Sequence, residues 1–241
     1  MPRYFIELAY KGTAYSGFQV QKNANSVQAE IEKGLKILYR QDIVLTGSSR
    51  TDAGVHALQN YFHFDSEKTL AEGVYQLNAI LPGDIAVKRI YEVGAGAHCR
   101  FDAISREYRY TIYFKKDPFI SDMAFYYPYP LDIGLLSEVS NELMLHEDFS
   151  AFSKRNTQVK SYLCTVHNSQ WINEGELLLY KVKANRFLRG MVKGLVGTML
   201  QVGRGKLSPV EFRELIRAGD SSRVDFSAPS HGLILERVNY L

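Results

Sequence analysis

The stretch IVLTGSSRTDAGVHALQNYFHFD, residues 43–65, decides the fold of the first half of this chain. Its apolar start predicts a short strand over 43–46, and the alternation of polar and aromatic residues predicts a second strand over 57–65. Between them, residues 47–58 read GSSRTDAGVHAL, with two serines, an arginine, an aspartate and a histidine. A loop this rich in reactive side chains, held between two strands, is a common place for chemistry.

The segments around this loop complete a recognisable order of elements. Residues 3–10 alternate and predict a strand, while apolar residues at helical spacing after Ser26, a suitable cap, predict a helix. A second helix is predicted from about Leu70 to Ile80, ended by Leu81-Pro82-Gly83, and a further strand over 85–93. The resulting order, β-α-β-β-α-β, is the split βαβ arrangement of ferredoxin-like folds.

The second half repeats that order loosely. We expect strands over 105–114, 159–170, 176–184 and 233–240, and helices around 135–143, over 187–202 and from a capping box at Ser208. Gly190, Gly194 and Gly197 thin one face of the second of these helices, so that another backbone can approach it. The sequence therefore predicts an α+β protein with two ferredoxin-like halves, 1–104 and 105–241. We expect their antiparallel sheets to be joined, with helices at the flanks and a cleft between the halves.

Composition restricts the class of protein. Charged residues make up 23% and hydrophobic residues 46% of the 241 positions, which is ordinary for a globular chain with a sizeable core. No apolar run is long enough to cross a bilayer, and the first residues do not have the pattern of a signal peptide. The two cysteines, Cys99 and Cys164, stand far apart and form no disulfide framework or metal motif. We expect a cytoplasmic protein without a membrane contact.

Positive charge is concentrated in one part of the chain. Residues 149–210 carry ten basic groups against two acidic ones, whereas residues 1–148 carry 15 basic and 19 acidic groups. A charge run is most often a solvated face, but here the cations alternate with apolar positions and so decorate folded elements. A positive surface on a folded domain favours a polyanionic partner, most simply nucleic acid.

Three interpretations compete for the polar residues of the loop. A nucleophilic serine, Ser48 or Ser49 with His56 or His231, lacks the second glycine of the nucleophile elbow and the strand-turn-helix context. A metal site would use Asp52, His56, His63 and Asp65, whose spacing fits no specific ligand motif. For Asp52, an Asx turn is the structural alternative, although Arg50-Thr51 before it and Ala53-Gly54 after it leave the carboxylate accessible.

The loop resembles the signature of the tRNA pseudouridine synthase A family, in which an aspartate follows Arg-Thr. Further matches run in order along nearly the whole chain: 15–19 (YSGFQ), 101–103 (FDA), 106–110 (REYRY), 146–149 (HEDF), 184–192 (ANRFLRGMV) and 228–233 (APSHGL). The resemblance implies a pseudouridine synthase fold and an isomerase that converts uridine to pseudouridine. Its substrate would be the tRNA anticodon stem-loop, at positions 38–40. No cofactor and no metal are implied, because the reaction has no redox step and no external group.

The resemblance also implies roles for individual residues. Asp52 would be the nucleophile on a uridine flipped out of its stack, Tyr110 would stack on the base and could help remove the C5 proton, and Arg50 would enter the RNA. Lys193 stands where the family usually has an arginine that pairs with the aspartate; it keeps the charge but loses the two-pronged geometry. The phosphate contacts would come from the basic run, with these members: Lys154, Arg155, Arg186 and Arg189.

Two further expectations follow from the resemblance. The protein would be a homodimer, with tRNA lying across both subunits. The competing hypothesis is a non-catalytic tRNA-binding or tRNA-folding protein on the same scaffold, or a paralogue with a shifted RNA substrate. The joint presence of Arg50, Asp52 and Tyr110 favours the enzyme, because binding alone has no use for a nucleophile.

Overall fold

The chain folds as two units, which the computed structural model describes over residues 1–67, 73–154 and 159–241. Unit 1 comprises Met1–Ile104 and Ile234–Leu241, and unit 2 comprises Ser105–Leu233. The expected division also fell after residue 104 but left the last strand with the second half, whereas its residues from Ile234 onward group with unit 1.

Unit 1 is built on an antiparallel sheet with β1 at its centre. The strands are β1 (Arg3–Tyr10), β2 (Thr46–Gly47), β3 (His56–Asp65), β4 (Ile85–Val93) and β9 (Leu233–Asn239). β1 pairs with β3 and β4, β2 pairs with β3, and β9 joins β3 in parallel at His56 and Ala57. The first four strands therefore have the order β4-β1-β3-β2, and the predicted β-α-β-β-α-β arrangement of this half is confirmed.

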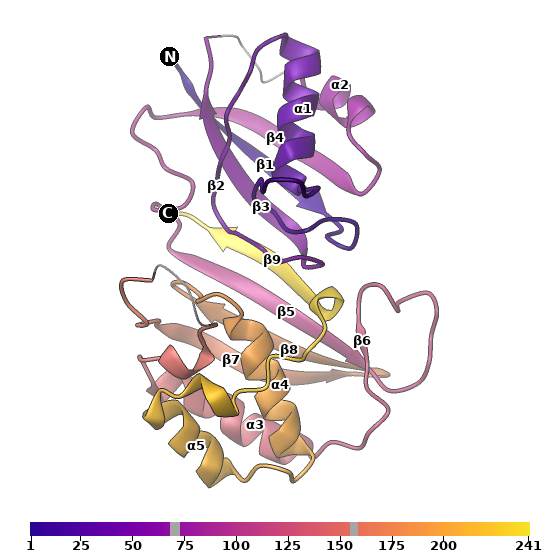
Figure 1. Ribbon diagram of the computed structural model, residues 1–241, viewed down its shortest axis with the longest axis vertical. Helices are drawn as coiled ribbons and strands as arrows, with labels where there is room; N and C mark the ends of the chain where they lie inside the picture. The colour runs from indigo at the N-terminus through magenta and orange to yellow at the C-terminus, as the bar shows by residue number, and fades with distance from the viewer. Residues whose placement is uncertain (68–72, 155–158) are drawn as a thin grey trace. The chain divides into compact units, whose positions relative to one another are not determined.

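Two helices cover one face of this sheet, α1 (Val27–Tyr39) and α2 (Val74–Ile80), which lie side by side in Figure 1. The predicted cap of α1 is confirmed, because the Ser26 side chain accepts a hydrogen bond from the backbone N–H of Ala29. Gly34 permits the close approach of α2, since a Cβ there would lie 2.9 Å from Leu77 Cδ1. Residues 70–72, where α2 was predicted to begin, lie outside the described residues.

The strand predicted over 43–46 is present, but its bounds are wrong: β2 contains only Thr46–Gly47. The reason is that side chains of α1 take the backbone groups of Leu45. Glu32 accepts a hydrogen bond from Leu45 N–H at 3.0 Å, and the Gln28 amide donates to Leu45 C=O at 3.0 Å. A residue whose donor and acceptor are both used by a helix cannot join a sheet ladder.

Unit 2 has its own antiparallel strands, and its described residues also form three α-helices. The strands are β5 (Ser105–Tyr113), β6 (Phe125–Tyr126), β7 (Val166–Glu174) and β8 (Leu177–Ala184). β8 pairs antiparallel with both β5 and β7, and β6 adds a short parallel pairing to β5. The helices are α3 (Ile133–Glu142), α4 (Met191–Gly203) and α5 (Pro209–Ala218), which pack together (Figure 1). The α+β class predicted for the chain is confirmed.

Short 3-10 helices also connect elements of unit 2 within the described residues. They are η2 (Leu143–Leu145), η3 (Ser150–Phe152), η4 (Ser221–Arg223) and η5 (Ser230–Gly232).

At α5 the predicted capping box is confirmed: Glu211 N–H donates to Ser208 Oγ, and Ser208 N–H donates back to the Glu211 carboxylate. Over the described residues, no helix has the length and apolar character of a membrane span.

Two boundaries in unit 2 differ from the sequence prediction. α4 begins at Met191 instead of residue 187, because Gly190 adopts φ +75° and the Arg189 carbonyl accepts a hydrogen bond from Lys154 N–H. β7 begins at Val166 instead of residue 159, because the preceding backbone pairs elsewhere. Cys164 N–H, for example, donates to the Glu147 carbonyl at 2.8 Å.

The thin face predicted for α4 is confirmed for two of its glycines. A Cβ at Gly197 would lie 2.2 Å from the Asp225 carbonyl oxygen, and one at Gly194 would lie 2.8 Å from the Phe226 ring. The segment 224–226 therefore runs directly against α4. Asp225 N–H also donates to Thr198 Oγ1 at 3.1 Å, which fixes this contact through a buried hydroxyl.

We predict that Gly197→Ala destabilises the protein by about 1–3 kcal/mol, the usual cost of overpacking, although alanine is the better helix former. Urea unfolding measures the change. Gly94→Ala is the matched control, because a Cβ at Gly94 meets nothing within 4 Å. Equal stability of the Gly197→Ala protein and the wild type would contradict the close backbone approach.

Candidate active site

The loop that joins β2 to β3 is fixed along its whole length by backbone hydrogen bonds. Ser48 N–H donates to the Tyr61 carbonyl, and the Thr51 carbonyl accepts from Phe18 N–H. Gly54 N–H donates to the Tyr15 carbonyl at 3.3 Å. The loop is therefore held from two sides, by β3 and by the segment 15–18, and its backbone is an ordered scaffold for the side chains.

Side chains of this loop alternate between the interior and the surface. The Thr51 hydroxyl lies 2.7 Å from the Tyr10 hydroxyl in the buried interior, and the Asn60 amide donates to Tyr10 at 3.1 Å. The flanking residues point outward: Arg50 is exposed and Asp52 is half-buried. Burial of Thr51 thus presents the two charged groups of the Arg-Thr-Asp triplet at the surface of unit 1.

Glycines allow the segment before α1 to come this close. A Cβ at Gly12 would lie 2.0 Å from the Val55 carbonyl oxygen, so the position excludes every other residue type without a backbone shift. Gly17 has φ +122°, and a Cβ there would lie 3.1 Å from the Thr51 carbonyl oxygen. Both glycines pack backbone against the loop.

The serines and His56 take positions inside this packing. Ser48 and Ser49 are buried, and the Ser48 hydroxyl accepts a hydrogen bond from Tyr240 at 3.4 Å. His56 Nδ1 accepts a hydrogen bond from Gly12 N–H at 2.9 Å, so that its own proton sits on Nε2. These contacts support a structural role for Ser48 and His56, and Ser49 is withdrawn from the surface by burial, whereas Asp52 is accessible on the loop.

The histidines and carboxylates of the metal interpretation are engaged in other ways. Asp65 forms an ion pair with Arg3 at 2.8 Å. Of the predicted metal ligands, only His63 belongs to a group that could hold a metal within the described ranges. Its partners there are His98 and Cys99, and the ligand atoms of the three lie within 4.8 Å of one another. Cys99 Sγ donates to the Thr46 carbonyl and lies 3.2 Å from His63 Nδ1, which ties the segment 98–101 to β2 and β3.

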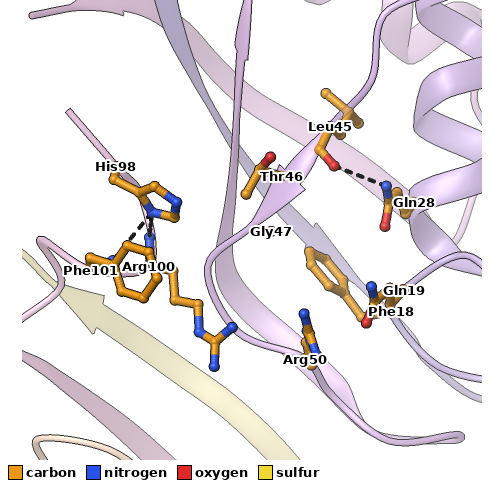
Figure 2. A pocket seen from close by; sticks show the side chains of 10 residues that line it. All are labelled: Phe18, Gln19, Gln28, Leu45, Thr46, Gly47, Arg50, His98, Arg100 and Phe101. Atoms are coloured by element: carbon orange, nitrogen blue, oxygen red, sulfur yellow. Dashed lines mark hydrogen bonds between the residues drawn. The ribbon is translucent and has the colours of Figure 1, made fainter. Parts of the chain in front are cut away.

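A hollow of about 260 Å³ opens beside the loop in unit 1, and Figure 2 shows its lining. Its walls come from three parts of the chain: Phe18, Gln19 and Gln28; Leu45, Thr46, Gly47 and Arg50; and His98, Arg100 and Phe101. Sequence reasoning assigned a role to Arg50 alone among these residues. An arginine next to a large aromatic side chain at 100–101 was the available signal.

Tyr110 lies on β5 of unit 2 with its side chain fully buried. Its hydroxyl donates to the Pro229 carbonyl at 2.8 Å, and a Cβ at Gly232 would come within 2.7 Å of its ring. Burial raises the pKa of Tyr110, so the hydroxyl is protonated at neutral pH. The segment 229–232 therefore sets the orientation of this ring and of its hydroxyl proton.

Lys193 lies in the first turn of α4 and is half-buried. Its ammonium donates to Ser230 Oγ at 3.2 Å, so Tyr110 and Lys193 both contact the same segment, 229–232. Burial, with a smaller contribution from the Lys193 charge, lowers the pKa of His231. The neighbouring imidazole is thus kept neutral.

The residues predicted to contact phosphates lie only partly close together. Lys154 and Arg189 are adjacent, because Lys154 N–H donates to the Arg189 carbonyl at 3.0 Å, and Lys154 borders a hollow of about 380 Å³ with Ser221, Ser222 and Phe226. Arg186 is exposed in the connection between β8 and α4, which also carries Arg189. Arg155 lies outside the described residues.

Known proteins with similar sequences share one description. The family model described as tRNA pseudouridine synthase matches residues 8–102 and 142–241. A tRNA pseudouridine synthase A of Parabacteroides distasonis is 43% identical over 100% of this chain and 96% of its own length. The proteins of the same name from Porphyromonas gingivalis and Staphylococcus saprophyticus are 43% and 36% identical, over 100% and 98% of this chain and 98% and 90% of their own lengths.

The imidazole of His63 makes the stability of unit 1 depend on pH. Burial, with smaller contributions from His98 and Arg3, lowers the pKa of His63 from 6.5 to about 4. Above pH 6.5 the imidazole is neutral in both states. As the pH falls toward 4, the unfolded chain binds the proton first and unfolding becomes more favourable. We predict that the free energy of unfolding falls by about 2 kcal/mol between pH 7 and pH 5 through this group.

Urea unfolding of His63→Gln at the two pH values checks this prediction. The variant removes the titrating group, so its loss of stability between pH 7 and pH 5 is expected to be about 2 kcal/mol smaller than that of the wild type. His167→Gln, on the exposed face of β7, is the control and keeps the wild-type dependence. Identical pH dependence in all three proteins would contradict the buried, neutral His63.

Proposed function

The chain belongs to the tRNA pseudouridine synthase family, and from this premise we propose that it modifies uridines of the tRNA anticodon stem-loop, at positions 38–40. Family membership makes the protein an isomerase that acts on uridine in tRNA. The finer assignment of the stem-loop rests on the resemblance of the loop 47–58 to the signature of the synthase A branch.

Asp52 is the proposed nucleophile, and one observation carries the proposal. It is the half-buried carboxylate of a loop whose backbone is held from two sides, with the buried Thr51 before it and the small residues Ala53 and Gly54 after it. A fixed backbone lets a carboxylate meet its substrate in one geometry, which is what covalent catalysis requires.

The reaction conserves every atom of the substrate. The C1′–N1 glycosidic bond breaks, the uracil turns, and a bond forms between C1′ and C5; the C5 proton leaves and N1 gains a proton. Because the product is an isomer, the balance needs no oxidant, reductant or transferred group. We assign to Asp52 the nucleophilic attack that separates the base from the sugar, whether its carboxylate oxygen bonds to the ribose or to the uracil ring.

A base inside a helical stack cannot reach a protein carboxylate, so the proposal includes extrusion of the uridine. Arg50 is exposed two residues before Asp52, and we propose that it enters the RNA beside the extruded uridine. For Tyr110 we propose contact with the extruded base. Because its hydroxyl keeps its proton and donates it to the Pro229 carbonyl, the role that we propose for Tyr110 is contact through the ring and not removal of the C5 proton.

The cations of unit 2 support the choice of RNA as the partner. Three of them lie on connections: Lys154 before β7, and Arg186 and Arg189 after β8. Phosphate contacts from such groups give affinity without reading the base sequence. The homodimer and the cytoplasmic location implied by the family resemblance stay predictions.

We predict that Asp52→Ala abolishes formation of pseudouridine, with a loss of at least about 10³-fold, while tRNA binding is retained. Unmodified tRNA is incubated with each protein and pseudouridine is mapped by chemical probing. Asp42→Ala, which removes an exposed carboxylate of the same unit, is the control and keeps wild-type activity. Product from Asp52→Ala would refute the nucleophile. Binding without product from any of the proteins, wild type included, would favour the non-catalytic tRNA-binding protein.

We further predict that Lys193→Ala lowers turnover about 10²-fold and tRNA affinity by less than about threefold, because a preorganised charge acts mainly on the reacting groups. Single-turnover rates and filter binding separate the two quantities. Lys193→Arg should restore part of the rate. The control is Lys206→Ala, which removes an exposed cation just beyond α4 and keeps wild-type turnover. A loss confined to binding would reduce Lys193 to a phosphate contact.

A further inference from the structure

The hollow beside the loop in unit 1 has the composition of an anion-binding surface. Its ten lining residues include Arg50, Arg100 and His98 and no carboxylate (Figure 2). Arg50 is exposed, and its guanidinium makes no hydrogen bond or ion pair with residues of the described ranges. A guanidinium without an internal partner at the edge of a hollow is available to a phosphate.

The aromatic side of the hollow is formed by Phe101, whose side chain is unusually open. Phe101 is 75% exposed, and its ring centroid lies 4.2 Å from that of His98 and 5.7 Å from the Arg100 guanidinium carbon. Leaving so much apolar surface in water forgoes the free energy that its burial would bring. An exposed phenylalanine beside an arginine is therefore suited to stack on a flat partner.

The turn that carries Phe101 is rigid. His98 Nδ1 accepts hydrogen bonds from the backbone N–H groups of Arg100 and Phe101, and the Asp102 carboxylate accepts from His98 N–H at 2.7 Å. Cys99 anchors the turn to the sheet through its bond to the Thr46 carbonyl. The backbone that carries the ring is thus fixed, which lowers the entropy lost when a ligand stacks on Phe101.

The other sides of the hollow are equally fixed. Phe18 is buried and stacks on Phe62, with ring centroids 4.3 Å apart and an interplanar angle of 7°. Gly47 leaves room beside it, since a Cβ there would lie 2.5 Å from the Phe18 ring. Gln19 is exposed at the rim, and its amide is suited to donate or accept at the edge of a base.

We propose that this hollow binds an unpaired nucleotide of the tRNA, with the base stacked on Phe101 and the phosphate held by Arg50 and Arg100. The proposal rests on the function proposed above and deepens it. Asp52 is not among the lining residues, so the nucleotide held here is a second one, distinct from the uridine that is isomerised. Binding it would fix the RNA beside the reacting nucleotide.

The first test measures affinity for unmodified tRNA by filter binding. Phe101→Ala should weaken binding roughly five- to hundredfold, the range for loss of one base–aromatic stack, and Phe101→Trp should restore it to within about threefold. Tyr75→Ala is the matched control, because Tyr75 is 82% exposed on α2 of the same unit and does not line the hollow. Wild-type affinity in Phe101→Ala would overturn the proposal.

The second test identifies the nucleotide. Synthetic tRNAs with a single abasic site at each unpaired position are bound to the wild type and to Phe101→Ala. At one position the abasic site should cost the wild type the same factor as Phe101→Ala, and the two changes together should cost no more than either alone. Losses that multiply at every position would overturn the proposal, as would a changed oligomeric state with unchanged tRNA affinity.

These results are separable from the proposed function. Pseudouridine is mapped in parallel with the wild type on the same tRNA. Absence of product would count against the catalytic assignment, yet the affinities of Phe101→Ala and of the abasic tRNAs would still decide whether the hollow holds a nucleotide. Product from the wild type with no coupling at any position would leave the catalytic assignment in place and refute the second nucleotide site.

Discussion

The buried hydrogen bond between Tyr10 and Thr51 is the constraint on which the candidate site depends. It draws the middle residue of Arg50-Thr51-Asp52 into the interior and so turns its two charged neighbours outward. Asn60 completes the contact from β3. A buried hydroxyl pair is costly to leave unsatisfied, so this arrangement resists the alternative in which the loop turns over and buries a charge.

Buried polar groups with hydrogen-bond partners also fix the second face of the unit 1 sheet. Glu7 of β1 points away from the helices and is buried, and burial alone would raise the pKa of its carboxyl; hydrogen bonds from Gln59, Arg89 and Tyr61 outweigh that effect and lower the pKa. Both faces of β1 are therefore committed, one to apolar packing under α1 and α2 and the other to a satisfied polar and aromatic layer. That rigidity carries over to β3, which holds one side of the loop.

Sequence reasoning recovered what short-range periodicity encodes. The strand Arg3–Tyr10, the Ser26 cap and the capping box at Ser208 depend on neighbours within a few residues, and all three were predicted. The failures depend on distant partners: nothing near Leu45 indicates that Glu32 would take its N–H, and nothing near Arg189 indicates that Lys154 would bond its carbonyl. The loop was found as a motif, whereas the open ring of Phe101 came from a turn whose closure needs the tertiary structure.

Lys193 departs from a local rule in a way that points to an anion. The N-terminal end of a helix carries partial positive charge, so a cation in the first turn costs about 0.3–1 kcal/mol where a carboxylate would stabilise. The first turn of α4 holds Lys193 and no acidic residue. Burial lowers the pKa of the neighbouring His231, so its imidazole stays neutral and adds no second positive charge. Folding alone does not explain a cation here, and such local conflicts are expected at functional sites. An anion brought to this turn would meet the ammonium of Lys193. A lysine supplies the positive charge at this turn, without the two-pronged geometry that a guanidinium would have.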